Sequence, residues 1–157
     1  MQIADLLSPD GVVAALKANG KKQLLQELSA RAASIIRMPE RRVYETLNER
    51  ERLGTTGVGQ GIAVPHGRLA DLEKITGVFA RLETPIEYEA VDGQPVDLVF
   101  MLLAPEGAGA DHLKALARVS RLLRNQSVCE KLRAAKSAEA LYAILTEPSV
   151  SAKSAAA

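Results

Sequence analysis

The stretch GTTGVGQGIAVPHG, residues 54–67, contains five of the eleven glycines and one of the two histidines of this 157-residue chain. Glycine lets a backbone take unusual conformations and approach a ligand closely. Histidine is the side chain most ready to act as a nucleophile or as an acid or base near neutral pH. The stretch therefore predicts an active-site loop built around His66.

Two helices are predicted before this loop. Apolar residues at helical spacing predict one helix over residues 22–36, and a second helix begins at Pro39 and continues to the start of the loop. The buried stripe of the second helix, Val43 and Leu47, continues to Arg50. We therefore expect a paired or functional arginine that faces inward beside the loop.

The middle of the chain is predicted to form a sheet. A short strand over residues 62–64 is expected to deliver His66 at its end, because Pro65 disfavours helix for the residue before it. Further strands are expected over residues 75–82, 86–89 and 96–103. Asp92 and Gly93 are expected to form the turn between the last two of these strands.

Helices are predicted again after the sheet. The first runs from residue 111 to residue 123. The second is opened by a capping box of Ser127 and Glu130, and the third covers residues 137–146 with Ser137 as its N-cap. Helices, strands and then helices predict an α/β or α+β sandwich of helices on a sheet.

The length and composition fit one domain. A chain of 157 residues with 47% hydrophobic and 25% charged content can bury a core large enough to fold unaided. We expect this domain over residues 1–147, with no internal repeat. Residues 148–157 are small and polar, and we expect a disordered tail there.

Composition also excludes several classes of partner. Only five aromatic residues and no Trp leave few platforms on which nucleic-acid bases could stack. The formal charge is +1 with both signs interspersed, which offers no footprint for DNA and no polybasic membrane anchor. The single Cys129 excludes an internal disulfide, is expected in the core, and fits a reducing cytoplasm. The sequence thus predicts a cytoplasmic protein that neither binds nucleic acid nor inserts into a membrane.

The glycine-rich loop matches no common cofactor motif. It lacks the Lys-Ser/Thr of a P-loop, and its glycines follow a helix and lack dinucleotide-binding spacing. The soft metal ligands of the chain are His66, His112 and Cys129, which stand at no recognised zinc spacing. We therefore expect neither a metal nor a cofactor.

Each histidine admits a functional and a structural interpretation. His66 stands between Pro65 and Gly67 with Arg68 close by, and this setting favours function over packing. His112 lies in the first turn of a helix, where free N–H groups favour an anion and disfavour an imidazolium. A neutral His112 beside a bound phosphate and an ordinary residue at a helix start are equally good interpretations.

The segment NERERLGTTGVGQGIAVPHG, residues 48–67, resembles the signature of the mannitol/fructose-type IIA components of the bacterial phosphoenolpyruvate-dependent phosphotransferase system. It is most similar to the nitrogen-regulatory members of that family. The resemblance covers almost the whole chain and includes IADLLSP (3–9), ETPI (83–86), DGQPVD (92–97) and DHLKAL (111–116). It implies a mixed central β-sheet flanked by helices.

The resemblance also implies which residues form the site. His66 corresponds to the phosphorylated histidine, Arg50 to the arginine of an Arg-Glu pair completed by Glu51, and His112 to the second active-site histidine. Small residues and backbone N–H groups of the loop can approach phosphoryl oxygens. On this ground the expected phosphate-binding or supporting residues are Glu51, Thr55, Thr56 and Gly67.

The implied function is that of a phosphocarrier with regulatory output. His66 accepts a phosphoryl group from a histidine-phosphorylated HPr-like carrier of the nitrogen branch, and regulated target proteins then respond to the charge. Such a protein is a phosphoryl-transfer component, with no small-molecule turnover of its own and no cofactor.

Three alternatives stay open. The first is a free-standing fructose- or mannitol-specific IIA component that donates phosphate to a membrane permease. The second is a binding module that kept the fold but lost phosphorylation. A metabolic enzyme is least favoured, because no second acid/base or cofactor motif accompanies His66.

Overall fold

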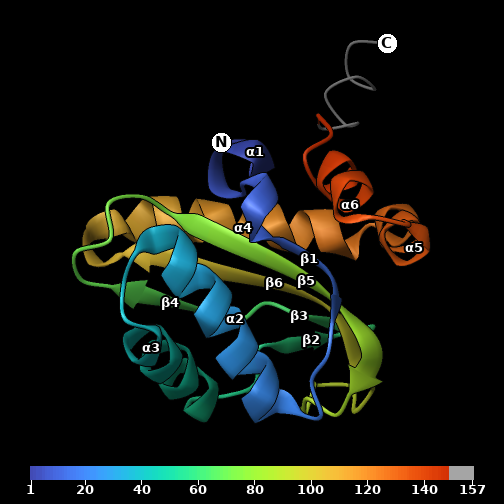
Figure 1. Ribbon diagram of the computed structural model, residues 1–157, viewed down its shortest axis with the longest axis horizontal. Helices are drawn as coiled ribbons and strands as arrows, with labels where there is room; N and C mark the ends of the chain where they lie inside the picture. Colours follow the sequence, from blue (N-terminus) through green and yellow to red (C-terminus); the bar gives the residue numbers. More distant parts are fainter. Residues whose placement is uncertain (149–157) are drawn as a thin grey trace.

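The computed structural model describes residues 1–148, and Figure 1 shows one sheet with helices against both of its faces. The N-terminal elements are α1 (Ile3–Leu6), a 3-10 turn (Pro9–Gly11), β1 (Val12–Leu16), α2 (Lys21–Ile36) and α3 (Glu40–Arg52). The strands that follow are β2 (Gly57–Gly59), β3 (Ile62–Ala63), β4 (His66–Leu69), β5 (Thr76–Ile86) and β6 (Val96–Pro105). A second 3-10 turn (Glu106–Ala108) leads to α4 (Gly109–Arg124), α5 (Gln126–Ala134) and α6 (Ala138–Leu145). Within residues 1–148, every helix falls short of the length and apolar character that a membrane span requires.

The sheet is mixed, as the family resemblance implies. Its strands lie in the order β1-β5-β6-β3-β2, and β4 also pairs with β6. The pairs β1–β5, β3–β6 and β4–β6 are parallel, whereas β5–β6 and β2–β3 are antiparallel. In this register His66, the first residue of β4, lies opposite Leu102 of β6.

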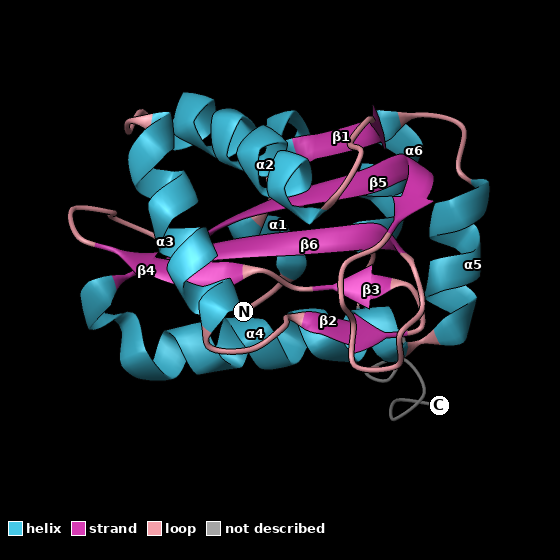
Figure 2. Ribbon diagram, turned by 90° about the horizontal axis from the view of Figure 1, so that it is seen from below, coloured by secondary structure: helices cyan, strands magenta, loops and turns pink. Residues whose placement is uncertain are grey.

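Strand β6 divides the core into two layers because it is buried on both faces. Val99 and Met101 belong to the layer under α2 and α3. Leu98, Phe100 and Leu102, the residues that alternate with them, belong to the layer under α1, α4, α5 and α6. Figure 2 shows α2 and α3 in front of the sheet in that view. The alternation follows from the two-residue period of a strand, and it makes β6 the centre of the molecule.

Most of the predicted helices are confirmed. The helix expected over residues 22–36 is α2, and α3 begins one residue after Pro39, which serves as its N-cap. Ser137 caps α6 as predicted, and its Oγ accepts a hydrogen bond from the N–H of Ala140 at 3.1 Å. Cys129 is buried on α5, also as predicted.

The predicted capping box of Ser127 and Glu130 is wrong. Helix α5 begins at Gln126, and its N-cap is Asn125, whose side-chain oxygen accepts from the N–H of Val128 at 3.2 Å. An asparagine is at least as good an N-cap as a serine. The cap two residues earlier therefore leaves Ser127 inside the first turn.

The strand boundaries around His66 also differ from the prediction. Strand β3 ends at Ala63, so His66 does not end it but opens the separate strand β4. The strand expected at 75–82 is β5, which extends to Ile86, and the separate strand expected at 86–89 is wrong because only Ile86 of that run lies in a strand. The predicted turn is confirmed, since Gly93 has a φ of 72° and donates to the carbonyl of Ala90 at 2.9 Å. Strands β1, β2 and β4 lie outside the predicted set, and the predicted tail lies outside the described residues apart from its first, Pro148.

Gly67 lets α3 pack closely against β4. A Cβ atom at this position would lie 2.5 Å from Cγ2 of Thr46 on α3, which is far inside van der Waals contact. The absence of a side chain therefore allows α3 to approach the strand that carries His66.

We expect Gly67→Ala to lower the free energy of unfolding by about 1–3 kcal/mol, the usual cost of overpacking. Urea unfolding followed by circular dichroism measures this change. The double variant Thr46→Ser/Gly67→Ala removes the clashing methyl group and keeps the hydroxyl that bonds the carbonyl of Arg42 at 3.0 Å. It should regain most of the loss. A Gly67→Ala protein as stable as the wild type would contradict this account of α3 packing.

Candidate active site

Strand β4 presents two opposite faces to the helices around it. His66 and Arg68, two residues apart, share one face, and Gly67 and Leu69 share the other. Leu69 and Gly67 face the layer of α2 and α3, as the burial of Leu69 and the contact of Gly67 with Thr46 show. His66 and Arg68 therefore lie on the side of α4.

Two hydrogen bonds fix the ring of His66. Its Nδ1 lies 2.9 Å from the backbone carbonyl oxygen of Val64, and its Nε2 lies 3.3 Å from Nε of Arg50. A carbonyl only accepts and an arginine only donates, so Nδ1 carries the proton and Nε2 presents its lone pair. The ring is thus held in the tautomer whose nucleophilic nitrogen is Nε2.

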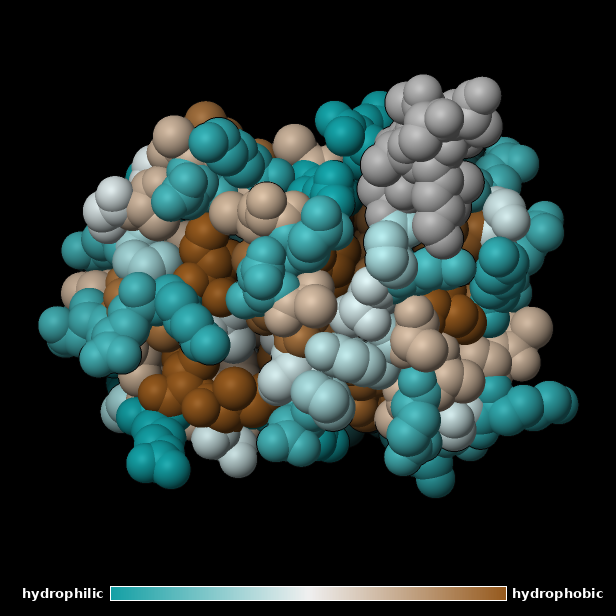
Figure 3. Space-filling model, turned by 90° about the horizontal axis from the view of Figure 1, so that it is seen from above, coloured by the Kyte–Doolittle hydropathy of each residue, from teal (hydrophilic) through white to brown (hydrophobic). Residues whose placement is uncertain are grey.

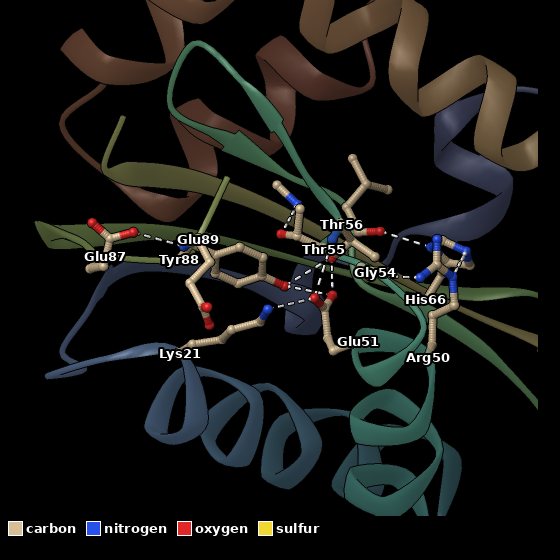
Figure 4. A network of polar contacts seen from close by, with 12 residues as sticks. Lys21, Arg50, Glu51, Gly54, Thr55, Thr56, His66, Glu87, Tyr88 and Glu89 are labelled. Atoms are coloured by element: carbon tan, nitrogen blue, oxygen red, sulfur yellow. Dashed lines mark hydrogen bonds and ion pairs between the residues drawn. The ribbon is translucent and has the colours of Figure 1, made fainter. Parts of the chain in front are cut away.

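Arg50 occupies the last turn of α3 and is half-buried. Its Nη1 donates to the carbonyl of Gly54 at 2.8 Å while its Nε donates to His66. Figure 4 shows the guanidinium between the loop and the imidazole. The prediction of an inward-facing, paired arginine is confirmed.

His112 lies in the first turn of α4 and is only 4% exposed. Its Nδ1 accepts from Nε of Arg68 at 3.2 Å, so in the neutral ring the proton is on Nε2. That Nε2 is buried and has no hydrogen-bond partner among the described residues. The rings of His66 and His112 stand edge to face, with centroids 5.7 Å apart. Two histidines that are 46 positions apart in sequence therefore share one site.

Both imidazoles are held in the neutral form. Burial lowers the pKa of His66, and the positive charge of Arg50 lowers it further, against the opposing effects of the Val64 carbonyl and Glu51. Burial also lowers the pKa of His112, and His66 and Arg68 act in the same direction. At neutral pH both rings are therefore uncharged, as the lone pair on Nε2 of His66 requires.

Glu51 is buried and points away from His66 (Figure 4). Its carboxylate accepts from Nζ of Lys21 at 2.8 Å and from the hydroxyl of Tyr88 at 2.9 Å. It also accepts from the N–H of Thr56 at 3.2 Å and from the Thr56 hydroxyl. Burial and the neighbouring carboxylate raise the pKa of Tyr88, which stays a donor. Each of these partners offsets part of the cost of removing a carboxylate from water.

Glu51 reaches His66 indirectly, through the backbone. Thr56, which Glu51 holds, accepts at its carbonyl from the N–H of Val64 at 3.0 Å. The carbonyl of Val64 in turn accepts from Nδ1 of His66. The carboxylate therefore supports the position and tautomer of the ring across three hydrogen bonds.

The other predicted loop residues make structural contacts. The hydroxyl of Thr55 accepts from the N–H of Gly57 at 3.0 Å, and Gly67 packs against Thr46. Contact of Thr55, Thr56 or Gly67 with a phosphoryl group stays a prediction.

An open hollow of about 680 Å³ lies over the two histidines, between α3, β4 and α4. Arg50, Arg68, His66 and His112 line it. Leu53 and Leu113 at its rim are 85% and 65% exposed. The hollow combines cationic donors with an apolar rim, a pattern suited to an anion that is presented by another protein.

Arg68, Lys21 and Tyr88 are absent from the predicted site residues. The spacing of His66 and Arg68 was the available signal for Arg68, because residues two apart on a strand share a face. Lys21 and Tyr88 lie 30 and 37 positions from Glu51, and no local pattern connects them to it.

The chain matches known proteins in both sequence and structure. The sequence profile described as "Phosphoenolpyruvate-dependent sugar phosphotransferase system, EIIA 2" matches residues 5–147. A nitrogen regulatory protein of Bradyrhizobium diazoefficiens is 60% identical over 152 residues, 97% of this chain and 99% of that protein. The nitrogen regulatory protein of Escherichia coli K12 is 40% identical over 148 residues, 94% of this chain and 91% of that protein. The crystal structure of nitrogen regulatory protein IIA-Ntr from Neisseria meningitidis has a TM-score of 0.87 at 38% identity, covering 92% of this chain and 99% of that chain.

We expect both histidines to titrate below their ordinary pKa of about 6.5. In the window between the folded and unfolded pKa values the unfolded chain binds more protons, so the free energy of unfolding falls as pH falls through it. Ring-proton NMR across acidic pH measures the two titrations, and urea unfolding at the same pH values measures stability. Midpoints at or above the ordinary value would show that the rings are not desolvated as described.

Proposed function

This chain belongs to the EIIA 2 family of the phosphoenolpyruvate-dependent sugar phosphotransferase system, and we propose that it carries a phosphoryl group on Nε2 of His66. One observation supports this proposal most directly. The Val64 carbonyl holds the proton on Nδ1, so that Nε2 is unprotonated and its lone pair accepts a hydrogen bond from Arg50. A neutral imidazole oriented in this way is a nucleophile that needs no separate base.

The proposed step transfers a phosphoryl group from the imidazole of the donor to the imidazole of His66. The lone pair of His66 Nε2 forms a bond to phosphorus, while the phosphorus–nitrogen bond of the donor phosphohistidine breaks and its electron pair returns to the donor ring. The proton on Nδ1 of His66 stays bonded to the Val64 carbonyl. The step therefore releases no proton, and catalysis rests on positioning and on neutralising the charge of the phosphoryl group.

Arg50 and His112 provide that neutralisation. By analogy with other phosphorylated side chains, the attached group carries a charge of about −1.5 to −2 at neutral pH. Arg50 already lies 3.3 Å from Nε2, so a small rotation moves its planar fork onto the phosphoryl oxygens. The unpartnered Nε2–H of His112 gains an acceptor in the same event. We propose that both donors stabilise the transferring group.

We propose that the phosphoryl donor is a histidine-phosphorylated, HPr-like carrier protein that docks over the hollow. The exposed side chains of Leu53 and Leu113 provide an apolar rim next to the charged centre. Figure 3 shows the α1 side of the molecule, away from α3, where apolar atoms also gather at the left of the view among hydrophilic side chains. A protein surface can cover such a rim and exclude water from the transfer.

The chain is a phosphocarrier of nitrogen-regulatory type, in keeping with relatives that are 60% and 40% identical to it. Its regulatory output follows from the charge on His66, which changes how target proteins bind. The alternative, a sugar-specific component that donates to a membrane permease, has less support because these relatives are nitrogen regulatory proteins. We also propose a cytoplasmic location, and one domain over residues 1–147 on the ground that the family profile matches residues 5–147.

Incubation with phosphoenolpyruvate, the first enzyme of the system and its carrier should produce an acid-labile mass increase of one phosphate. His66→Ala should abolish this increase, and Arg50→Met should slow it about 100-fold, as expected for the loss of one charge-stabilising donor. Intact-protein mass spectrometry over time measures both. Arg41→Met, which removes an exposed arginine from the same helix, is the matched control.

The same experiment with the nitrogen-branch and sugar-branch carriers distinguishes the two candidate functions. Faster transfer from the nitrogen-branch carrier is the expected result. If neither carrier phosphorylates the wild-type protein, the proposed function is wrong.

We expect Leu113→Asp to raise the KM for the carrier about tenfold, with a smaller effect on the rate at saturation, because it places a charge in the apolar rim. Val91→Asp is the matched control, since Val91 is 71% exposed and does not line the hollow. Steady-state transfer rates at varied carrier concentration measure both. Equal KM values for the two variants would count against docking at this rim.

A further inference from the structure

The two arginine–histidine pairs of the site use opposite ring nitrogens as acceptors. Arg50 donates to Nε2 of His66, and Arg68 donates to Nδ1 of His112. His66 thereby presents a lone pair at Nε2, whereas His112 presents a proton at Nε2. One ring is prepared as a nucleophile and the other as a donor.

A neutral imidazole can carry its proton on either ring nitrogen, so the position of the proton on Nε2 of His112 requires an explanation. Burial keeps this ring neutral, so the choice between the two tautomers decides what it can do. An arginine cannot accept a hydrogen bond, so Arg68 is compatible only with a bare Nδ1. The other nitrogen must then carry the proton.

The side chain of Arg68 is exposed, and its Nε contacts His112. None of the ion pairs within residues 1–148 includes Arg68, and its Nε lies 3.2 Å from His112. The result is a buried donor at His112 Nε2 without a partner. Buried polar atoms in folded proteins are almost always hydrogen-bonded, so this buried donor near His66 is suited to bind an acceptor group.

The geometry of β4 places His66 and Arg68 on the same side of the strand as His112. His66 and Arg68 share a face of β4, and the ring centroids of His66 and His112 are 5.7 Å apart. The strand that supplies the nucleophile therefore also supplies the residue that orients its neighbour.

We propose that Arg68 is a positioning residue that holds His112 in the tautomer with its proton on Nε2, so that His112 donates to the phosphoryl group on His66. This inference rests on the proposed function of His66 and adds a residue to it. Arg68 acts through His112, and its contribution disappears when His112 is removed.

The tautomer of His112 is measured directly by the nitrogen-15 shifts of its ring at a pH of about 8, well above the ordinary histidine pKa of about 6.5. The wild type should show a protonated Nε2 and a bare Nδ1. Arg68→Met should show a mixture of tautomers, and Arg68→Lys, which keeps a donor, should move the shifts back towards the wild type. A protonated Nδ1 in the wild type, or wild-type shifts in Arg68→Met, would overturn the inference.

Phosphoryl transfer at saturating carrier gives the second readout. Arg68→Met should slow transfer to His66 about tenfold, less than the loss of a directly contacting donor. In the His112→Ala background, Arg68→Met should cause no further loss, as expected for two residues that act as one unit. Arg41→Met removes an exposed positive charge from α3 outside the hollow, and is expected to leave the His112 tautomer unchanged and the rate within about threefold of wild type.

These experiments distinguish the proposed role of Arg68 from the proposed phosphorylation of His66. Normal phosphorylation of the wild type together with an undiminished rate in Arg68→Met, or equal losses with and without His112, would refute the role of Arg68 and leave the proposed function standing. Absence of phosphorylation in the wild type would refute the proposed function, and the nitrogen-15 shifts would still decide whether Arg68 sets the tautomer.

Discussion

The buried carboxylate of Glu51 is the constraint on which the site depends. A charge that is removed from water must be surrounded by donors, and here they come from α2 (Lys21), from the glycine-rich loop (Thr56) and from the segment after β5 (Tyr88). Meeting that requirement fixes the path of the loop as it leaves α3. The loop then holds Val64 through the Thr56 carbonyl, and Val64 holds His66. The orientation of one imidazole is thus a consequence of satisfying a charge elsewhere.

The site also requires that helices approach strand β4 from both faces of the sheet. Strand β4 is short and pairs only with β6 among residues 1–148, so α3 and α4 can both approach it. Gly67 removes the side chain that would hold α3 away, and Arg50 then reaches His66. His112 approaches from α4 on the other side. The same burial that packs these elements lowers the pKa of both rings, so folding itself keeps His66 neutral.

The strongly periodic elements were predictable, whereas the short ones were not. Helix α2 and strand β6 carry long apolar patterns that local physics decides. Strand β4 has four residues, including a glycine and an arginine, and no alternation long enough to reveal it. Its existence depends on pairing with β6, about 36 positions away. The prediction of where α5 starts was wrong for a different reason. Two acceptable N-caps, Asn125 and Ser127, lie two residues apart, and local sequence does not choose between them.

The sequence by itself determined the family and the order of the main elements, and it predicted His66, Arg50 and His112 as site residues, because these rest on local pattern and residue type. Only the tertiary structure decided which nitrogen of His66 is free, that Glu51 supports the loop instead of facing the histidines, and that Arg68 contacts His112. The reason is physical. A tautomer, a buried charge and a pKa depend on partners and on exclusion of water, and in this fold those partners come from segments that meet only when the chain is folded.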